Sequence, residues 1–298
     1  MRCSSWLSAA DINKNAEQLG AFAVYLWKFG MNRKQTGNTY STICSKLCAV
    51  RWFHKNTAGY DPGVNASHAI LLRGIRRFSD PVVKQQPLTA RLLRMIFGAI
   101  DLTQPRDQLL WGGLLLGYFF LLRRSEYLFI GRKVHSYILR LSAIRFFGDN
   151  EQSVEPKQAR VVGVTLNGAE NNQFGREEIR YHGKSGDKVI CPVRAARWVL
   201  KAAIAFGTNP GGPALSMRKR GISAEDISKT IKRAASRSGL DPARFSTHSV
   251  RIGGATALLN AGADRLVIKL LGRWLSNAFE DYPVLSAKGT QGLSQQMC

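Results

Sequence analysis

The pattern of apolar and polar positions divides the chain into a helical first part and a mixed second part. In the first part, apolar residues recur at helical spacing over residues 10–29, 39–55 and 67–78, and turn-forming residues follow each stretch. Residues 80–88 hold two prolines and two glutamines between helical patterns, which is typical of a linker. The sequence therefore predicts a helical domain at residues 1–79, a linker at 80–88 and a second domain at 89–298.

The second domain is predicted to be mainly α-helical with a small antiparallel β-sheet. Period-two alternation indicates strands, and the third and fourth of these are expected to form a hairpin around residues 183–186. The helical stretches are 89–100, 106–123, 193–205, 224–237, 248–260, 266–271 and a short one that ends near Tyr282; the strand-like stretches are 137–147, 159–166, 178–181 and 188–191.

The charge of the chain points to a polyanionic partner. It has 298 residues, 43 Lys and Arg against 20 Asp and Glu, and a formal net charge of +23. The excess occurs in both predicted domains, so both are expected to face phosphate groups. In the first domain the candidate DNA-contacting residues lie in the helical stretches or between them; they are Arg33, Lys34, Lys46, Arg51, Arg73, Arg76 and Arg77.

The composition argues against several other classes of protein. Five cysteines, with no CxxC pair and no histidine at ligand spacing, predict reduced thiols in an intracellular protein and no metal site. The longest apolar run, residues 109–122, is too short to cross a bilayer and predicts a buried core helix, and the chain starts without a signal-peptide pattern. No carboxylates cluster as a two-metal nuclease requires. We expect no cofactor and no membrane partner.

The segment from Thr247 to Thr256 carries the most informative motif. His248 and Arg251 are three residues apart and so share one face of a helix, with Thr247 as its expected N-cap. Backbone N–H groups at such a helix start attract a phosphate. The two glycines Gly253 and Gly254 allow a close approach of another backbone. The motif therefore predicts half of a phosphate clamp.

Three further segments carry candidate chemistry. Arg123 follows an apolar run, and its guanidinium can bind two phosphate oxygens at once, which a lysine cannot do. The neighbouring Arg124 is interpreted as a solvated charge. Lys184 lies in a glycine-flanked turn from which an ammonium can reach a leaving oxygen, and Lys188 is a competing candidate. Tyr282 lies downstream of residues 272–274 and offers a hydroxyl nucleophile.

These four segments, in this order, resemble the catalytic domain of the tyrosine recombinase (phage integrase) family, and the helical first part resembles its core-binding domain. The stretch from Gly272 to Tyr282 is most similar to recombinases of eukaryotic mobile elements. The resemblance implies that Tyr282 attacks a scissile phosphate, forms a 3′-phosphotyrosyl bond and releases a 5′-hydroxyl without nucleotide or metal. It also implies that Glu126 orients Arg123 and that Lys184 protonates the departing 5′-oxygen.

The chain departs from the family pattern at two positions. The family has His or Trp about nine residues before the tyrosine, where this chain has Arg273 at nine and Trp274 at eight. Either side chain can donate a hydrogen bond to a phosphate oxygen, and the spacing favours Arg273. Pro283 directly follows Tyr282, so the nucleophile is expected at the last turn of its helix.

The leading interpretation is a site-specific recombinase or integrase that acts on double-stranded DNA as a homo-oligomer inside the cell, and in the nucleus if the source is eukaryotic. Two alternatives stay open. One is a DNA-binding protein derived from such an enzyme, with catalysis lost through the changes around Tyr282. The other is a monomeric nicking and closing enzyme similar to type IB topoisomerases, which uses the same chemistry.

Overall fold

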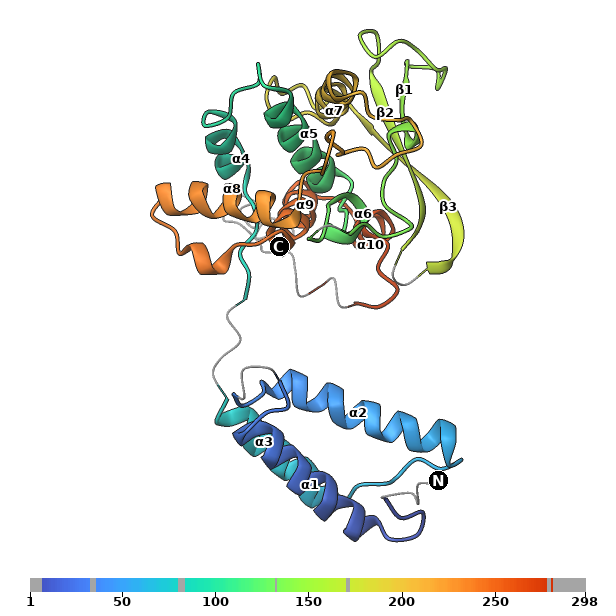
Figure 1. Cartoon of the computed structure of the whole chain (residues 1–298), viewed down its shortest axis with the longest axis vertical. Coiled ribbons are helices and arrows are strands. Elements are labelled where there is room, and N and C mark those ends of the chain that lie inside the picture. Colours follow the sequence, from blue (N-terminus) through green and yellow to red (C-terminus); the bar gives the residue numbers. More distant parts are fainter. Residues whose placement is uncertain are drawn as a thin grey trace, which may run out of the picture. The chain divides into compact units, whose positions relative to one another are not determined.

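The chain forms two compact units, Met1–Val83 and Lys84–Cys298 (Figure 1). The computed structural model describes residues 7–32, 36–79, 84–131, 133–169, 172–277 and 280. The first four residues of the predicted linker, and the predicted short helix at Tyr282, lie outside these ranges. None of the described helices is long and apolar enough to cross a membrane.

The first unit contains three helices, α1 (Ile12–Lys28), α2 (Tyr40–Thr57) and α3 (Ala66–Arg77). Each begins where a side chain accepts a hydrogen bond from a backbone N–H of the first turn, which stabilises the helix start; these N-cap residues are Asp11, Thr39 and Asn65. The three predicted helices are confirmed within two residues at either end. They enclose a small apolar core of Leu7, Leu19, Ala23, Leu26, Ile43, Leu47 and Ile75.

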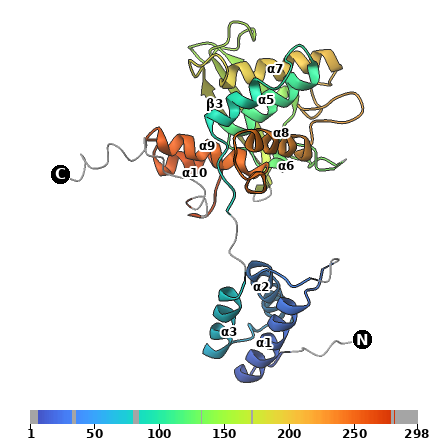
Figure 2. The same ribbon diagram turned by 90° about the vertical axis from the view of Figure 1, so that its left-hand side faces the viewer.

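Helices also build most of the second unit, as predicted. Its central helix, α5 (Pro105–Phe119), packs along α7 (Pro192–Phe206). Together with the sheet and α8 (Ala224–Arg237), these two helices form the largest buried core of the described residues (Figure 2). The predicted stretches 224–237 and 248–260 coincide with observed helices. The helices are α4 (Ala90–Phe97), α5 (Pro105–Phe119), α6 (Arg124–Tyr127), α7 (Pro192–Phe206), α8 (Ala224–Arg237), α9 (His248–Asn260) and α10 (Arg265–Gly272), with short 3-10 turns at Leu141–Ala143 and Pro242–Arg244.

The predicted small antiparallel sheet is confirmed, with the order β1 (Ile144–Phe147), β2 (Val161–Ala169) and β3 (Asn172–Gly183). The predicted hairpin at residues 183–186 is wrong, because residues 178–181 pair with β2 and residues 188–191 form no strand. The Asp187 carboxylate instead accepts the N–H groups of Val189 and Ile190 at 2.7 and 2.9 Å. This local turn replaces the ladder that a strand would need. Of the predicted strand 137–147, only the last four residues are extended into the sheet.

The helix predicted over residues 106–123 ends at Phe119, so its predicted end is wrong. Leu121 has a φ of 49°, and a new short helix starts at Arg124. Leu121 is fully buried in an apolar cluster with Ala255 and Ile268, and this contact fixes the bend. A non-glycine residue at positive φ costs about 1 kcal/mol, which burial of a leucine more than offsets.

Helix α9 packs directly on the backbones of other segments. A Cβ on Gly254 would lie 2.1 Å from the carbonyl oxygen of Tyr118, and one on Gly253 would lie 2.2 Å from that of Leu88. The Leu88 N–H also donates to the carbonyl oxygen of Ser249 at 2.9 Å. The two glycines therefore let α9 lie against the end of α5 and against the segment that enters the second unit.

Replacement of Gly254 by Ala is expected to lower the free energy of unfolding of the second unit by about 2–3 kcal/mol, because the obstacle is a backbone carbonyl. Gly74 in α3 provides a control, since a Cβ there meets nothing within 4 Å. Gly74→Ala should leave the second unit unchanged and stabilise the first by about 0.5–1 kcal/mol. Hydrogen exchange resolved by unit measures both effects. Unchanged protection of α9 in Gly254→Ala would contradict this packing.

Candidate active site

Arg123 occupies the N-cap position of α6, directly after the bend at Leu121. Its backbone N–H donates to the Glu126 carboxylate at 2.7 Å, and its guanidinium donates to the other oxygen of the same group at 3.0 Å. Glu126 is only 1% exposed. One buried carboxylate therefore fixes both the backbone and the side chain of Arg123.

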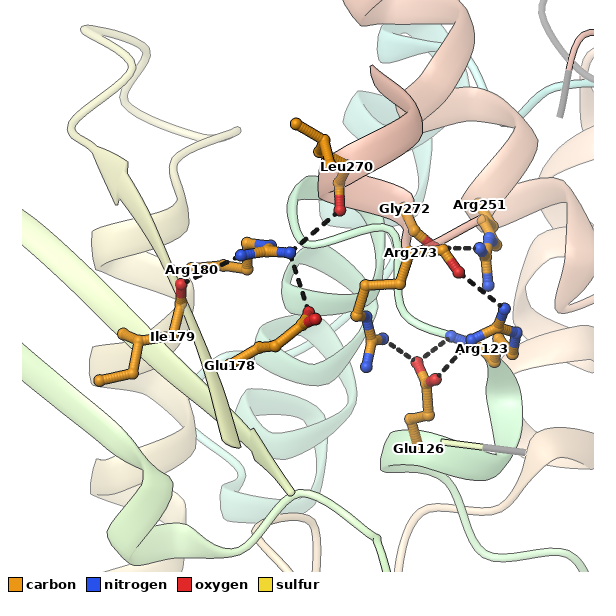
Figure 3. Close-up of polar contacts among 9 residues, drawn as sticks. All are labelled: Arg123, Glu126, Glu178, Ile179, Arg180, Arg251, Leu270, Gly272 and Arg273. Atoms are coloured by element: carbon orange, nitrogen blue, oxygen red, sulfur yellow. Dashed lines mark hydrogen bonds and ion pairs between the residues drawn. The ribbon is translucent and has the colours of Figure 1, made fainter. Parts of the chain in front are cut away.

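Glu126 also binds the arginine that follows α10. The Arg273 guanidinium donates to the carboxylate at 2.5 Å, and its side chain is 10% exposed (Figure 3). A single negative charge thus faces two positive charges from segments far apart in the sequence. We call the group of Arg123, Glu126 and Arg273 the carboxylate bridge. Its net charge is positive, which suits a site that receives a further anion.

Three arginines donate to backbone carbonyls at the end of α10 (Figure 3). Arg180 of β3 donates to Leu270 at 3.2 Å, Arg251 of α9 donates to Gly272, and Arg123 donates to Arg273 at 3.2 Å. The last carbonyls of a helix have no partner within it and carry partial negative charge. The arginines add hydrogen bonds to these groups, of which the Leu270 carbonyl also accepts the Arg273 N–H at 3.1 Å, and so they hold the end of α10 against α6, α9 and the sheet.

Trp274 packs between Arg251 and the end of α10. The Arg251 guanidinium carbon lies 4.2 Å from the centre of the indole ring, and Arg251 itself is 4% exposed. A Cβ on Gly272 would lie 1.7 Å from the same ring, so only glycine leaves it room. Arg273, between these two residues, adopts a φ of 54°. The turn thereby sends the Trp274 and Arg273 side chains in different directions.

A hollow of about 690 Å³ brings several predicted residues together. Its arginines come from the start of α6 and from α9, and the described residues that line it include no aspartate or glutamate. Such a surface favours an anion. The lining residues are Leu122, Arg123, Arg124, Ser125, Ile130, His135, Ser246, Thr247, His248, Arg251, Trp274, Leu275 and Ser276.

His248 is the first residue of α9 and lines this hollow. His248 is exposed at the edge of the hollow, but partial desolvation of its ring, followed by the nearby charges of Arg251 and Arg124, lowers the pKa of His248. The imidazole is therefore held neutral at neutral pH, so that it can both accept and donate a hydrogen bond. Thr247 stands at the N-cap position, but its side chain makes no capping bond, which corrects the sequence expectation.

Not all predicted catalytic residues lie at the hollow. Arg273 is directed to Glu126 and is absent from the lining, so the placement favours Trp274 over Arg273, against the preference drawn from spacing. Lys184 and its competitor Lys188 line a separate hollow of about 300 Å³ beyond the end of β3. Tyr282 lies outside the described residues.

The basic residues of the first unit differ in their surroundings. Arg51 donates twice to the Asp61 carboxylate, at 3.0 and 3.1 Å, so its charge is compensated. Arg76 lies over the ring of Tyr40, 5.7 Å from its centre. Arg73, Arg76 and Arg77 are exposed and Lys46 is half-buried, whereas Arg33 and Lys34 lie outside the described residues.

Sequence reasoning missed two residues of this region. Arg180 is one of several charged residues in β3, and His135 lies in a loop without periodicity, so nothing local marks either as part of the site. No group of three His, Cys, Asp or Glu residues that could hold a metal ion occurs within the part of the chain that the structure describes.

Comparison with known proteins identifies the fold. No family model matches the sequence, and no curated protein matches it. The structure is similar to the Tn1549 transposon integrase in complex with circular intermediate DNA, at 15% identity over 95% of this chain and 84% of that one, with a TM-score of 0.54. The XerH site-specific recombinase bound to a palindromic difH substrate gives 10% identity, 96% and 71% coverage and a TM-score of 0.58.

A lambda integrase dimer bound to a COC′ core site is also similar, at 15% identity over 94% of this chain and 83% of that one, with a TM-score of 0.50. The chain therefore has the fold of the tyrosine recombinases and integrases, as its motifs led us to expect. At these identities the similarity concerns the fold, and the chemistry has to be argued from the residues of this chain.

Replacement of Glu126 by Gln is expected to lower the free energy of unfolding by about 3 kcal/mol, because it leaves two largely buried guanidiniums without their counter-charge. Glu178→Gln is the control: Glu178 pairs with Arg180 at 2.8 Å but both side chains are more exposed, so about 0–1 kcal/mol is expected. Urea denaturation of both variants measures the difference. Equal losses would show that the carboxylate bridge is no more than a surface ion pair.

The His248 ring should titrate at a lower pH than a free imidazole, whose pKa is about 6.5. As the pH falls below that value, an unfolded chain takes up the proton first, so His248 should favour unfolding there and contribute nothing above it. Nuclear magnetic resonance of the ring carbon measures the midpoint. Arg124→Gln should raise it because a repelling charge is removed, and the distant Arg237→Gln should not. An unshifted midpoint would contradict the burial and repulsion inferred for this ring.

Proposed function

We propose that the protein is a site-specific DNA recombinase or integrase that cleaves and rejoins DNA strands through a 3′-phosphotyrosyl intermediate. The observation that carries this proposal is the convergence of Arg123, His248, Arg251 and Trp274 on one hollow that favours anions. These residues come from three segments far apart in the sequence. The similar structures of XerH and of the Tn1549 integrase are DNA complexes, which supports DNA as the partner.

The geometry suits stabilisation of a phosphodiester during attack. Arg123 and Arg251 are held by Glu126 and by the carbonyls of Arg273 and Gly272. A guanidinium has five N–H donors, and two of those in Arg123 donate to the Glu126 carboxylate and to the Arg273 carbonyl. Donors fixed before the reaction stabilise developing charge without reorganisation, which is usually the largest contribution to catalysis.

In the proposed reaction, the Tyr282 oxygen forms a bond to phosphorus, and the bond from phosphorus to the 5′-oxygen breaks. Arg123 and Arg251 bind the non-bridging oxygens, while His248 and the Trp274 indole N–H donate further hydrogen bonds. The phosphotyrosyl bond conserves the energy of the phosphodiester, so attack by a 5′-hydroxyl rejoins the strand without a nucleotide. The exposed arginines of α3 would contact the DNA backbone, and paired sites would require more than one copy of the chain.

One observation favours the second candidate function, a DNA-binding protein derived from a recombinase. Neither Lys184 nor Lys188 lines the hollow that holds the two arginines. If no other group donates a proton to the leaving oxygen, cleavage would be slow while binding would persist. The two candidates differ in covalent chemistry, not in affinity for DNA.

A nicked suicide substrate, built from duplexes enriched by binding selection, should trap a covalent protein–DNA adduct in the presence of EDTA. Tyr282→Phe should abolish the adduct and retain binding. Arg123→Ala should slow its formation by about 10²–10³-fold, as loss of one preorganised donor does in other enzymes. Lys184→Ala serves as the matched control outside the hollow and should change the rate less than about tenfold.

Denaturing gels score the adduct, and a mobility-shift assay scores binding. Tight binding by the wild type without any adduct would select the DNA-binding candidate. An adduct that survives in Tyr282→Phe would place the nucleophile elsewhere.

A further inference from the structure

This inference rests on the proposed function and concerns the proton that the leaving 5′-oxygen needs. An alkoxide is a poor leaving group, so cleavage requires a proton donor beside the scissile phosphate. The sequence assigns that role to Lys184, yet Lys184 lines a different hollow from Arg123 and Arg251. A second histidine, His135, does line the hollow that holds the arginines.

The loop that carries His135 is fixed at both ends. At one end, the Phe129 N–H donates to the Ile222 carbonyl at 3.1 Å, and the Phe129 carbonyl accepts from Ala224 at 2.9 Å. At the other end, the Leu139 N–H donates to the Glu126 carbonyl at 2.7 Å. The loop is therefore attached to the same residue that holds Arg123.

Contacts within the loop hold His135 itself. Ile130 and Lys133 exchange backbone hydrogen bonds at 3.0 and 3.2 Å, and the His135 carbonyl accepts from the Ile138 N–H at 3.1 Å. The His135 ring stacks on Tyr137, with centroids 5.0 Å apart and planes inclined by 17°. His135 is half-buried. Stacking and backbone bonds thus restrict the ring while one side faces the hollow.

Of the two histidines at the hollow, His248 is held in its neutral form, which leaves His135 as the candidate proton donor. Burial, Arg251 and Arg124 lower the pKa of His248 and so favour its neutral form, which suits it to bind a phosphate oxygen or to accept a proton. Histidine is also the side chain that enzymes use most often for proton transfer. The remaining lining residues are arginines, hydroxyl groups, an indole and apolar side chains, which are poorer acids at neutral pH.

We propose that His135 is the general acid that protonates the departing 5′-oxygen. As the Tyr282 oxygen bonds to phosphorus, it releases its phenolic proton to solvent water. The bond from phosphorus to the 5′-oxygen breaks, and the electron pair of that bond takes the proton of the His135 imidazolium. The products are the 3′-phosphotyrosyl adduct, a 5′-hydroxyl and a neutral imidazole. On rejoining, the neutral imidazole removes the proton from the attacking 5′-hydroxyl, and the departing Tyr282 oxygen takes a proton from water, so that the starting state is restored.

The test compares two suicide substrates that differ in one atom, a normal 5′-oxygen or a bridging 5′-sulfur at the scissile phosphate. A thiolate leaves without protonation, so it makes a general acid unnecessary. His135→Ala should slow adduct formation by about 10²–10⁴-fold on the oxygen substrate and by less than about threefold on the sulfur substrate. Lys133→Ala, in the same loop but outside the lining, should match the wild type on both. Lys184→Ala, which tests the competing assignment, should slow adduct formation on the oxygen substrate by less than about tenfold and should gain nothing from the sulfur substrate.

Other outcomes would overturn the proposal. An unchanged rate for His135→Ala on the oxygen substrate removes His135 from catalysis, and sulfur rescue of Lys184→Ala instead returns the role to the lysine. Equal losses on both substrates would show that His135 only positions the phosphate; His135→Asn, which preserves polarity and size, shows whether such a loss is due to misfolding. If the wild type forms no adduct on either substrate, the proposed function fails first.

Discussion

The carboxylate of Glu126, buried between Arg123 and Arg273, is the interaction on which the arrangement of the second unit's candidate site depends. It joins Arg123, the N-cap of α6, to Arg273, the residue that follows α10. These two segments lie far apart in the sequence. Burial of an ion pair often adds little net stability, because desolvation offsets the attraction, but removal of one partner is costly. The bridge therefore specifies one arrangement of these segments more than it adds to the stability of the fold.

The same bridge leaves the hollow short of negative charge. Glu126 is shared between Arg123 and Arg273, and Arg251 donates to the Gly272 carbonyl, whose partial charge offsets only part of a full positive charge. Positive-φ residues at Leu121 and Arg273 stand at either side of this cluster, and such strain persists only where surrounding contacts enforce it. A bound phosphate would supply the missing charge, so the protein already has the arrangement that an anion would stabilise.

Local signals in the sequence predicted the helices well and the spatial relations less well. Apolar periodicity predicted α8 and α9 with their observed bounds, and the spacing of His248 and Arg251 predicted a shared helix face, which the structure places at one hollow. The bend after Phe119 depends on burial of Leu121 against Ala255 and Ile268, which are distant in sequence. The position of Arg273 likewise depends on a residue distant in sequence, Glu126. Spacing therefore could not show that the left-handed turn at Arg273 directs this side chain to Glu126 and leaves Trp274 at the hollow.

Glu126 relates the proposed acid to the arginines through two different groups. Its carboxylate holds Arg123 and Arg273, whereas its backbone carbonyl accepts the Leu139 N–H that closes the loop of His135. A change of its side chain therefore acts on the arginines and leaves the loop's hydrogen bond in place. In this scheme, Glu126 positions both the arginines that stabilise charge and the loop that transfers the proton. A substitution can therefore impair one of these two functions without the other. That separation would let the proton donor move from the end of β3 to this loop without any change in the residues that bind the phosphate.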